Sequence, residues 1–128
     1  MILDLDPGVD DALAILMALH SPEPEIIGLT TVSGNVLLAQ TTENALKVLE
    51  LAGRTDIPVC MGAARPLARE PRYAYEVRGP EGLGASELPE PETMPAGEAV
   101  DFRTDPYRPV PRNRPSSWLP WYRRPACT

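Results

Sequence analysis

The feature that most constrains the fold is a short apolar run at the N-terminus that ends in carboxylates and leads into an apolar helix. Residues 1–6 read Met-Ile-Leu-Asp-Leu-Asp, which is typical of a buried parallel strand whose carboxyl end meets solvent. Pro7 and Gly8 break this run, and Asp10 and Asp11 then stand where a helix would begin. Carboxylates are favourable there because unpaired amide groups and the positive end of the helix dipole lie at a helix N-terminus. The sequence therefore predicts a strand, a tight turn and a helix.

The alternation of strand and helix continues along the chain. The further elements predicted are a strand over residues 25–32, a turn over 33–35, a helix over 39–52 and a strand over 57–61. The helix shows apolar residues at helical spacing, and Gly53 suits a left-handed cap at its end. This βαβαβ order predicts an α/β fold, the N-terminal part of an open, mostly parallel, Rossmann-like sheet with right-handed crossovers.

Periodicity and charge both change in the second half of the chain. Residues 65–97 are rich in Pro, Glu and Gly, and predict a long loop rather than packed structure. Residues 1–102 carry 6 Lys+Arg and 17 Asp+Glu, whereas residues 103–128 carry 6 Arg, 1 Asp and 6 of the 16 prolines. Proline at this density cannot continue a helix or a central strand. We therefore predict a partial domain over residues 1–102 and a Pro/Arg-rich, disordered tail over residues 103–128.

Composition argues against several classes of protein. No apolar run approaches the roughly 20 residues of a membrane span, and no basic stretch precedes the first apolar residues as in a secretory signal. Cys60 and Cys127 lie far apart without metal-ligand spacing, so we interpret them as reduced thiols in the cytoplasm. We expect a cytoplasmic protein with neither a membrane nor a nucleic-acid partner. The basic tail leaves binding to nucleic acid or to an acidic surface as the alternative.

Four carboxylates are concentrated around the predicted turn: Asp4, Asp6, Asp10 and Asp11. In an open α/β sheet the carboxyl ends of the strands are where ligands bind. Like charges raise each other's pKa, so a hard divalent cation is favoured, and oxygen ligands select Ca²⁺ or Mg²⁺ over zinc. The alternative is that Asp10 and Asp11 only cap the helix while Asp4 and Asp6 are solvated. Two carboxylate pairs on either side of Pro-Gly favour the metal site.

Residues 4–11, Asp-Leu-Asp-Pro-Gly-Val-Asp-Asp, resemble the D-x-D-P-G-x-D-D signature of the inosine–uridine-type nucleoside hydrolases. Residues 30–35 resemble the T-T-V-x-G-N turn of that family, and residues 79–84 resemble one of its later glycine-rich loops. The resemblance covers about residues 1–102. One departure is Arg78, which stands where the family usually has a histidine before the glycine-rich loop. A tolerated loop substitution and a change at the site both remain open for Arg78.

The resemblance implies a ribonucleoside hydrolase with Ca²⁺ as cofactor, which cleaves the N-glycosidic bond of purine or pyrimidine nucleosides to ribose and free base for salvage. Asp6 would be the general base that activates a calcium-bound water, and it would also contact the metal. Asp11 would be a calcium ligand, and Asp4 a ligand or a support beside it. Asp10 and Asn35 would hold the ribose hydroxyls. The ribonucleoside is the expected partner, and full-length relatives are expected to be homo-oligomers.

The resemblance ends abruptly after Phe102. The family would continue with a helix and a strand resembling V-x-L-V-A-L-G-P-L-T-N, which supplies a backbone carbonyl to the calcium. Trp118 and Trp121 each have a single codon, and codons read from the third base around them are compatible with part of that strand. We hypothesise a frameshift after residue 102, with a genuine extension as the alternative. In either case the later site residues of the family are missing, and we expect an inactive fragment.

Two further functions remain as alternatives. A phosphoryl-transfer domain of the haloacid dehalogenase type also has an Asp-x-Asp after its first strand, although here Pro7-Gly8 follows Asp6 in place of Gly-Thr. A non-enzymatic binding module that uses its basic tail is the other.

Overall fold

The computed structural model describes residues 1–84 and 86–104, and the predicted tail from residue 105 onward lies outside these residues. The elements are β1 (Ile2–Leu5), α1 (Val9–His20), β2 (Gly28–Thr31), α2 (Leu38–Leu51), β3 (Val59–Met61), α3 (Tyr75–Arg78), β4 (Gly97–Glu98) and α4 (Ala99–Thr104). The first five elements follow the predicted βαβαβ order. The last helix, α4, continues across the boundary that the sequence suggests at residue 102.

The four strands form one parallel sheet in the order β1-β2-β3-β4. Leu3 of β1 lies opposite Leu29 of β2, and Leu29 lies opposite Val59 of β3. The prediction of an open parallel α/β sheet is confirmed. Both β2 and β3 are shorter than predicted, and for β3 a reason is visible because Pro58 has no N–H to donate to a strand ladder.

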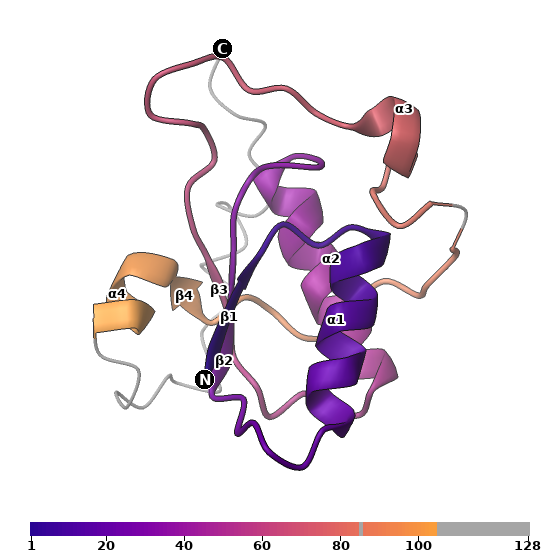
Figure 1. Cartoon of the computed structure of the whole chain (residues 1–128), viewed down its shortest axis with the longest axis vertical. Coiled ribbons are helices and arrows are strands. Elements are labelled where there is room, and N and C mark those ends of the chain that lie inside the picture. The colour runs from indigo at the N-terminus through magenta and orange to yellow at the C-terminus, as the bar shows by residue number, and fades with distance from the viewer. Residues whose placement is uncertain (85, 105–128) are drawn as a thin grey trace.

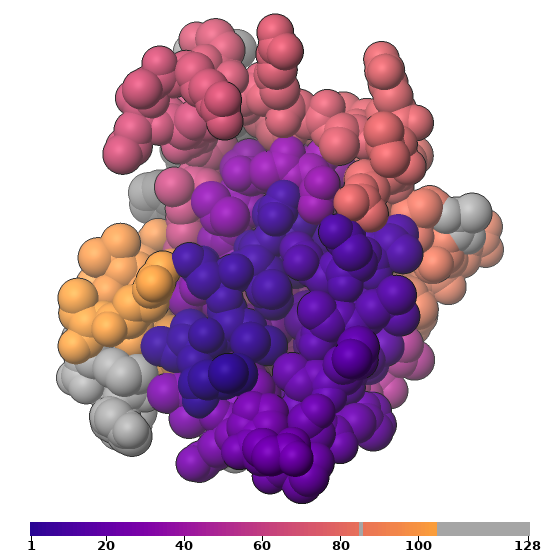
Figure 2. All heavy atoms as spheres, in the orientation of Figure 1, coloured from indigo at the N-terminus to yellow at the C-terminus, as the bar shows by residue number. Residues whose placement is uncertain are grey.

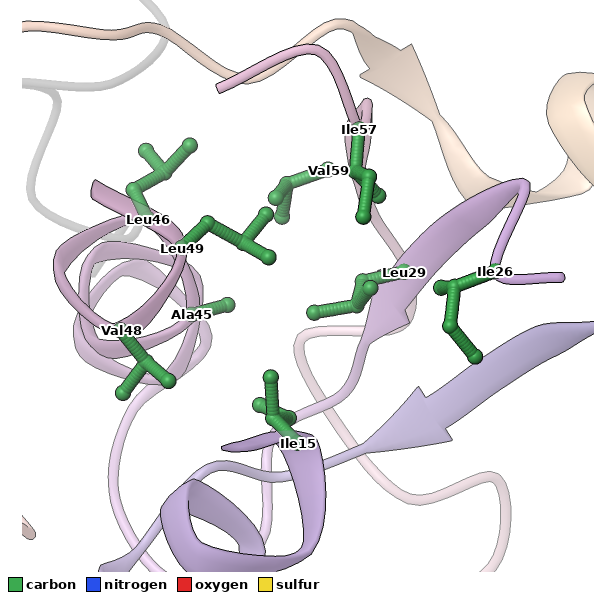
Figure 3. Close-up of a cluster of buried hydrophobic side chains, with 9 residues drawn as sticks. All are labelled: Ile15, Ile26, Leu29, Ala45, Leu46, Val48, Leu49, Ile57 and Val59. Carbon is green, nitrogen blue, oxygen red and sulfur yellow. The ribbon is translucent and has the colours of Figure 1, made fainter. Parts of the chain in front are cut away.

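Helices α1 and α2 cover one face of the sheet and enclose the main core (Figure 1). Figure 3 shows the nine buried side chains of this core: Ile15, Ile26, Leu29, Ala45, Leu46, Val48, Leu49, Ile57 and Val59. The apolar residues of α2 recur every three or four positions, so they line one side of the helix and face the sheet. Each large apolar side chain buried in this way contributes about 1.5–3 kcal/mol. No helix within the described residues is long and apolar enough to cross a membrane.

The opposite face of the sheet carries a smaller cluster beside α4, which lies on the other side of the strands from α1 and α2 (Figure 1). Cys60, Ala99 and Phe102 are buried there. Gly28 permits this packing, because a Cβ atom on Gly28 would lie 2.2 Å from Cζ of Phe102. The sheet is therefore covered on both faces, as parallel sheets usually are.

Residues 65–97 are mostly a loop, as predicted, but the prediction that they lack packed structure is wrong in part. This segment contains the single turn of α3, and the side chain of Leu83 in it is buried. It is also fixed to α2, because Glu50 accepts hydrogen bonds from the amide of Thr93 at 2.7 Å and from its hydroxyl at 2.6 Å. Strand β4 then adds a fourth parallel strand that the sequence did not predict. These contacts are mostly polar, which explains why no apolar periodicity in the sequence predicts them.

Candidate active site

The turn between β1 and α1 brings two of the predicted carboxylates together. Pro7 and Gly8 are buried, and the amide of Ala12 donates to the Gly8 carbonyl at 2.9 Å to start the helix. The amide of Asp6 donates to Oδ2 of Asp11 at 3.2 Å. This bond turns the Asp11 carboxylate back towards the end of β1, so Asp6 and Asp11 lie close together at the carboxyl edge of the sheet.

Asn35 reaches the same turn from the end of the neighbouring strand β2. Its amide N–H donates to Oδ2 of Asp6 at 2.7 Å, and its side-chain Nδ2 donates to the Asp6 carbonyl at 3.0 Å. Gly34 allows this close approach, since a Cβ atom there would lie 2.2 Å from Oδ2 of Asp6. Parallel strands that end side by side account for this meeting of residues far apart in sequence.

Asp10 lies next to Asn35 across Gly8. A Cβ atom on Gly8 would lie 3.0 Å from Nδ2 of Asn35 and 3.4 Å from Oδ1 of Asp10, so both side chains border the same point. The guanidinium of Arg78, at the end of α3, donates to both oxygens of Asp10 at 2.8 Å and 3.2 Å. Arg78, which departs from the family pattern, therefore binds Asp10, a residue predicted to bind ribose. Figure 2 shows the region around α3 at the edge of the N-terminal segment.

The negative charge of this cluster is only partly balanced. The pKa of Asp11 is raised, chiefly by burial and then by the neighbouring charges of Asp6 and Asp10. The hydrogen bond from the Asp6 amide and the charge of Arg78 act in the opposite direction and do not fully offset these effects. A group that adds positive charge beside Asp11 would therefore be favoured.

Asp4 is engaged by other partners. It lies in β1 opposite Thr30 of β2, and the Thr30 hydroxyl donates to Oδ1 of Asp4 at 2.6 Å. Its second oxygen, Oδ2, is bound by Arg103 of α4 at 2.7 Å. Of the site residues predicted from the sequence, Asp6, Asp10, Asp11 and Asn35 come together, whereas both oxygens of Asp4 are directed to Thr30 and Arg103.

The donors present match a hard cation in kind. Asp6 and Asp11 offer carboxylate oxygens that lie close enough for the charge of Asp6 to raise the pKa of Asp11. Within residues 1–84 and 86–104, however, no three carboxylate, imidazole or thiolate groups are placed to hold a metal ion together. These residues thus fit Ca²⁺ in donor chemistry and supply part of a shell of about six to eight oxygens.

The sequence profile of the family described as inosine-uridine preferring nucleoside hydrolase matches residues 1–117. The chain belongs to this family. The match extends past Phe102, so the end of the resemblance that the motifs indicated there is not the end of the family match.

Individual relatives give the same result. The chain is 50% identical over 97 residues to probable uridine nucleosidase 2 of Arabidopsis thaliana, and the alignment covers 74% of the chain and 30% of the relative. It is 50% identical over 95 residues to the pyrimidine-specific ribonucleoside hydrolase RihA of Photobacterium profundum, covering 74% of the chain and 31% of the relative. The solved purine-preferring ribonucleoside hydrolase from Gardnerella vaginalis superposes with a TM-score of 0.76 at 39% identity, covering 81% of this chain and 34% of that one. The chain spans about a third of the length of these relatives.

Three residues that contact the site or its turn carried no role in the sequence analysis: Thr30 and Arg103, which bind Asp4, and Asn44, which binds Pro7. Thr30 could have been found as the β2 residue opposite Asp4, because a polar residue inside a buried strand requires a partner. Asn44 is a polar residue on the apolar side of a predicted helix, which is a comparable signal. No local signal indicates Arg103, which is 99 residues from Asp4.

Proposed function

We propose that the turn from Asp6 to Asp11, together with Asn35, forms the metal- and ribose-binding part of a ribonucleoside hydrolase site. The observation that carries this proposal is the double hydrogen bond by which Asn35 meets Asp6 at adjacent strand ends, beside carboxylates that are only partly neutralised. The relatives differ in the base that their names mention and agree on the ribonucleoside. The proposal therefore concerns the ribose end of the substrate.

Asp6 is proposed as the general base for the attacking water. The amide of Asn35 holds one of its oxygens at 2.7 Å and so fixes the orientation of the carboxylate. Asp6 and Asp11 would hold Ca²⁺, which when bound lowers the pKa of an adjacent water. Asp4, bound to Thr30 and Arg103, would support the site from within β1.

Asp10 and Asn35 are proposed to bind the ribose hydroxyls. Both side chains border Gly8, whose lack of a Cβ atom leaves room for a close approach. Departure of the base leaves positive charge on the sugar, and the nearby carboxylates would stabilise the oxocarbenium-like transition state. The products, ribose and a free base, correspond to purine and pyrimidine salvage in the cytoplasm.

We propose that the 128-residue chain alone does not turn over, because its described residues supply only part of a calcium shell. A reducing-sugar assay with inosine and uridine in the presence of Ca²⁺ tests this directly, and robust release of ribose would overturn it.

Calcium binding by the chain is tested separately by thermal unfolding. Millimolar Ca²⁺ should raise the midpoint temperature of the wild type, which corresponds to a gain of about 1.4 kcal/mol in the free energy of unfolding at ten times the dissociation constant. The rise should disappear in Asp11→Asn and persist in Asp101→Asn, which removes an exposed carboxylate from α4 instead. Equal responses of the two variants to Ca²⁺ would exclude a metal site at Asp11.

A further inference from the structure

Asn44 is a polar side chain buried completely inside the fold. It lies on α2, and its exposed fraction is 0%. Its Nδ2 donates one hydrogen bond to the Pro7 carbonyl at 2.9 Å and another to the Glu81 carbonyl at 2.7 Å. Its Oδ1 accepts from Nε2 of Gln40 at 3.3 Å. Both N–H donors of this amide are therefore used, and they serve two segments on opposite sides of it in the sequence.

These two segments border the candidate site. Pro7 belongs to the turn that carries the site carboxylates, and Glu81 belongs to the glycine-rich loop that follows Arg78. The loop packs closely on Asn44, since a Cβ atom on Gly82 would lie 3.2 Å from its Nδ2.

Backbone bonds extend the link to Arg78 and to the residue before α3. The amide of Gly84 donates to the Arg78 carbonyl at 2.8 Å, and the amide of Ala74 donates to the Asn35 carbonyl at 2.7 Å. The Arg78 guanidinium binds Asp10 and so joins the end of α3 to the turn that Asn44 holds through Pro7. One amide group thus fixes both sides of the space bordered by Asp10 and Asn35.

We propose that Asn44 is a positioning residue for the ribose-binding groups. Through Pro7 it holds the turn that bears Asp10, and through Glu81 it holds the glycine-rich loop that follows Arg78. An apolar side chain of similar size removes the donor from the buried Pro7 carbonyl and from the Glu81 carbonyl, so the turn and the loop are expected to separate locally while the core persists. The ribose part of this inference rests on the proposed function.

Hydrogen exchange separates positioning from general stability. In Asn44→Leu, the Gly84 and Ala74 amides should exchange at least ten times faster than in the wild type, while the core amides of Leu49 and Val59 change far less. Thr42→Val is the matched control, because it removes a different buried polar group of α2, a hydroxyl that contacts the sheet through Thr31. The control should affect loop and core amides alike.

A second variant covers the case in which Asn44→Leu does not fold. Asn44→Asp keeps the size of the side chain and exchanges the two donors for a carboxylate that faces two carbonyl oxygens. It should give the same local increase in exchange. Uniform acceleration across the chain, or unchanged exchange at Gly84 and Ala74 in a folded variant, would overturn the positioning role.

A titration with D-ribose, followed by amide chemical shifts, links the positioning role to the site. We expect the dissociation constant for ribose to rise at least fivefold in Asn44→Asp and to remain unchanged in Thr42→Val. A wild-type chain that does not bind ribose would contradict the proposed ribose site, whereas the exchange pattern would still decide whether Asn44 positions the loop and the turn. Equal ribose affinity in the wild type and Asn44→Asp would overturn the positioning role.

Discussion

Replacing Gly34 with alanine tests whether the Asp6 carboxylate is held in the place that the site requires. A methyl group on Gly34 would lie 2.2 Å from Oδ2 and 2.7 Å from Cγ of Asp6, which is far inside the contact distance. The φ angle of Gly34 is not among the positive ones, so alanine suits the backbone and conflicts only with the side chain. The substitution therefore forces Asp6 away from the Asn35 amide.

The size of the effect follows from the bond that is lost. The hydrogen bond from the Asn35 amide to the Asp6 carboxylate is 2.7 Å long, and a bond to a charged group contributes about 1.5–3 kcal/mol. Alanine also lowers the conformational entropy of the unfolded chain, which stabilises the folded state by about 0.4–1 kcal/mol. We expect a net loss of about 1–2 kcal/mol, equivalent to roughly 4–16 °C in the melting temperature of a domain of this size.

Urea unfolding followed by circular dichroism measures the loss, and the amide resonance of Asn35 reports on its bond. Ser33→Ala in the same turn is the control and should change stability by less than about 0.5 kcal/mol, because its hydroxyl has no partner among the described residues. In an Asp6→Ala background Gly34→Ala should no longer destabilise the chain, and only the gain of about 0.4–1 kcal/mol from the unfolded state should remain. A Gly34→Ala chain as stable as the wild type, with an unmoved Asn35 resonance, would refute the reasoning.

Three further predictions concern the rest of the chain. Burial raises the pKa of Glu50, but hydrogen bonds from the Thr93 hydroxyl and nearby amides outweigh this effect and leave the pKa below its ordinary value of 4.5. The stability that these bonds contribute should be present above pH 4.5 and decline as pH falls through the lowered pKa. Unfolding measured against pH should show a smaller contribution in Thr93→Val. Phe102→Ala should destabilise the chain by about 3–5 kcal/mol in urea unfolding, whereas Val100→Ala, on the exposed side of α4, should change it by less than about 0.5 kcal/mol. Sequencing the DNA after codon 102 should reveal a shifted frame that encodes a G-P-L-T-N-like segment, and its absence would favour a genuine extension.

Local patterns in the sequence were sufficient for the first five elements. Apolar spacing and the Pro7-Gly8 break predicted β1, α1 and α2 because periodicity and turn residues act over a few positions. Strand β4 could not be predicted, since Gly97 and Glu98 are poor strand formers and are extended only through pairing with β3.

In the candidate site, too, some contacts could be predicted from the sequence and others could not. The approach of Asp6 and Asn35 could be expected from the carboxyl ends of adjacent parallel strands. The ion pairs of Asp4 with Arg103 and of Asp10 with Arg78 could not, because 99 and 68 residues separate the partners and only the packed chain brings them together.

The sheet order β1-β2-β3-β4 also has a consequence for synthesis on the ribosome. Each strand pairs with the one made just before it, so the sheet can grow from one edge as the chain emerges. Asp6 and Asn35 can meet as soon as β1 and β2 pair, well before the segment that carries Arg78 has been translated. During early synthesis Asp10 therefore lacks its ion-pair partner Arg78. The ion pair can form only when the glycine-rich loop folds back onto α2.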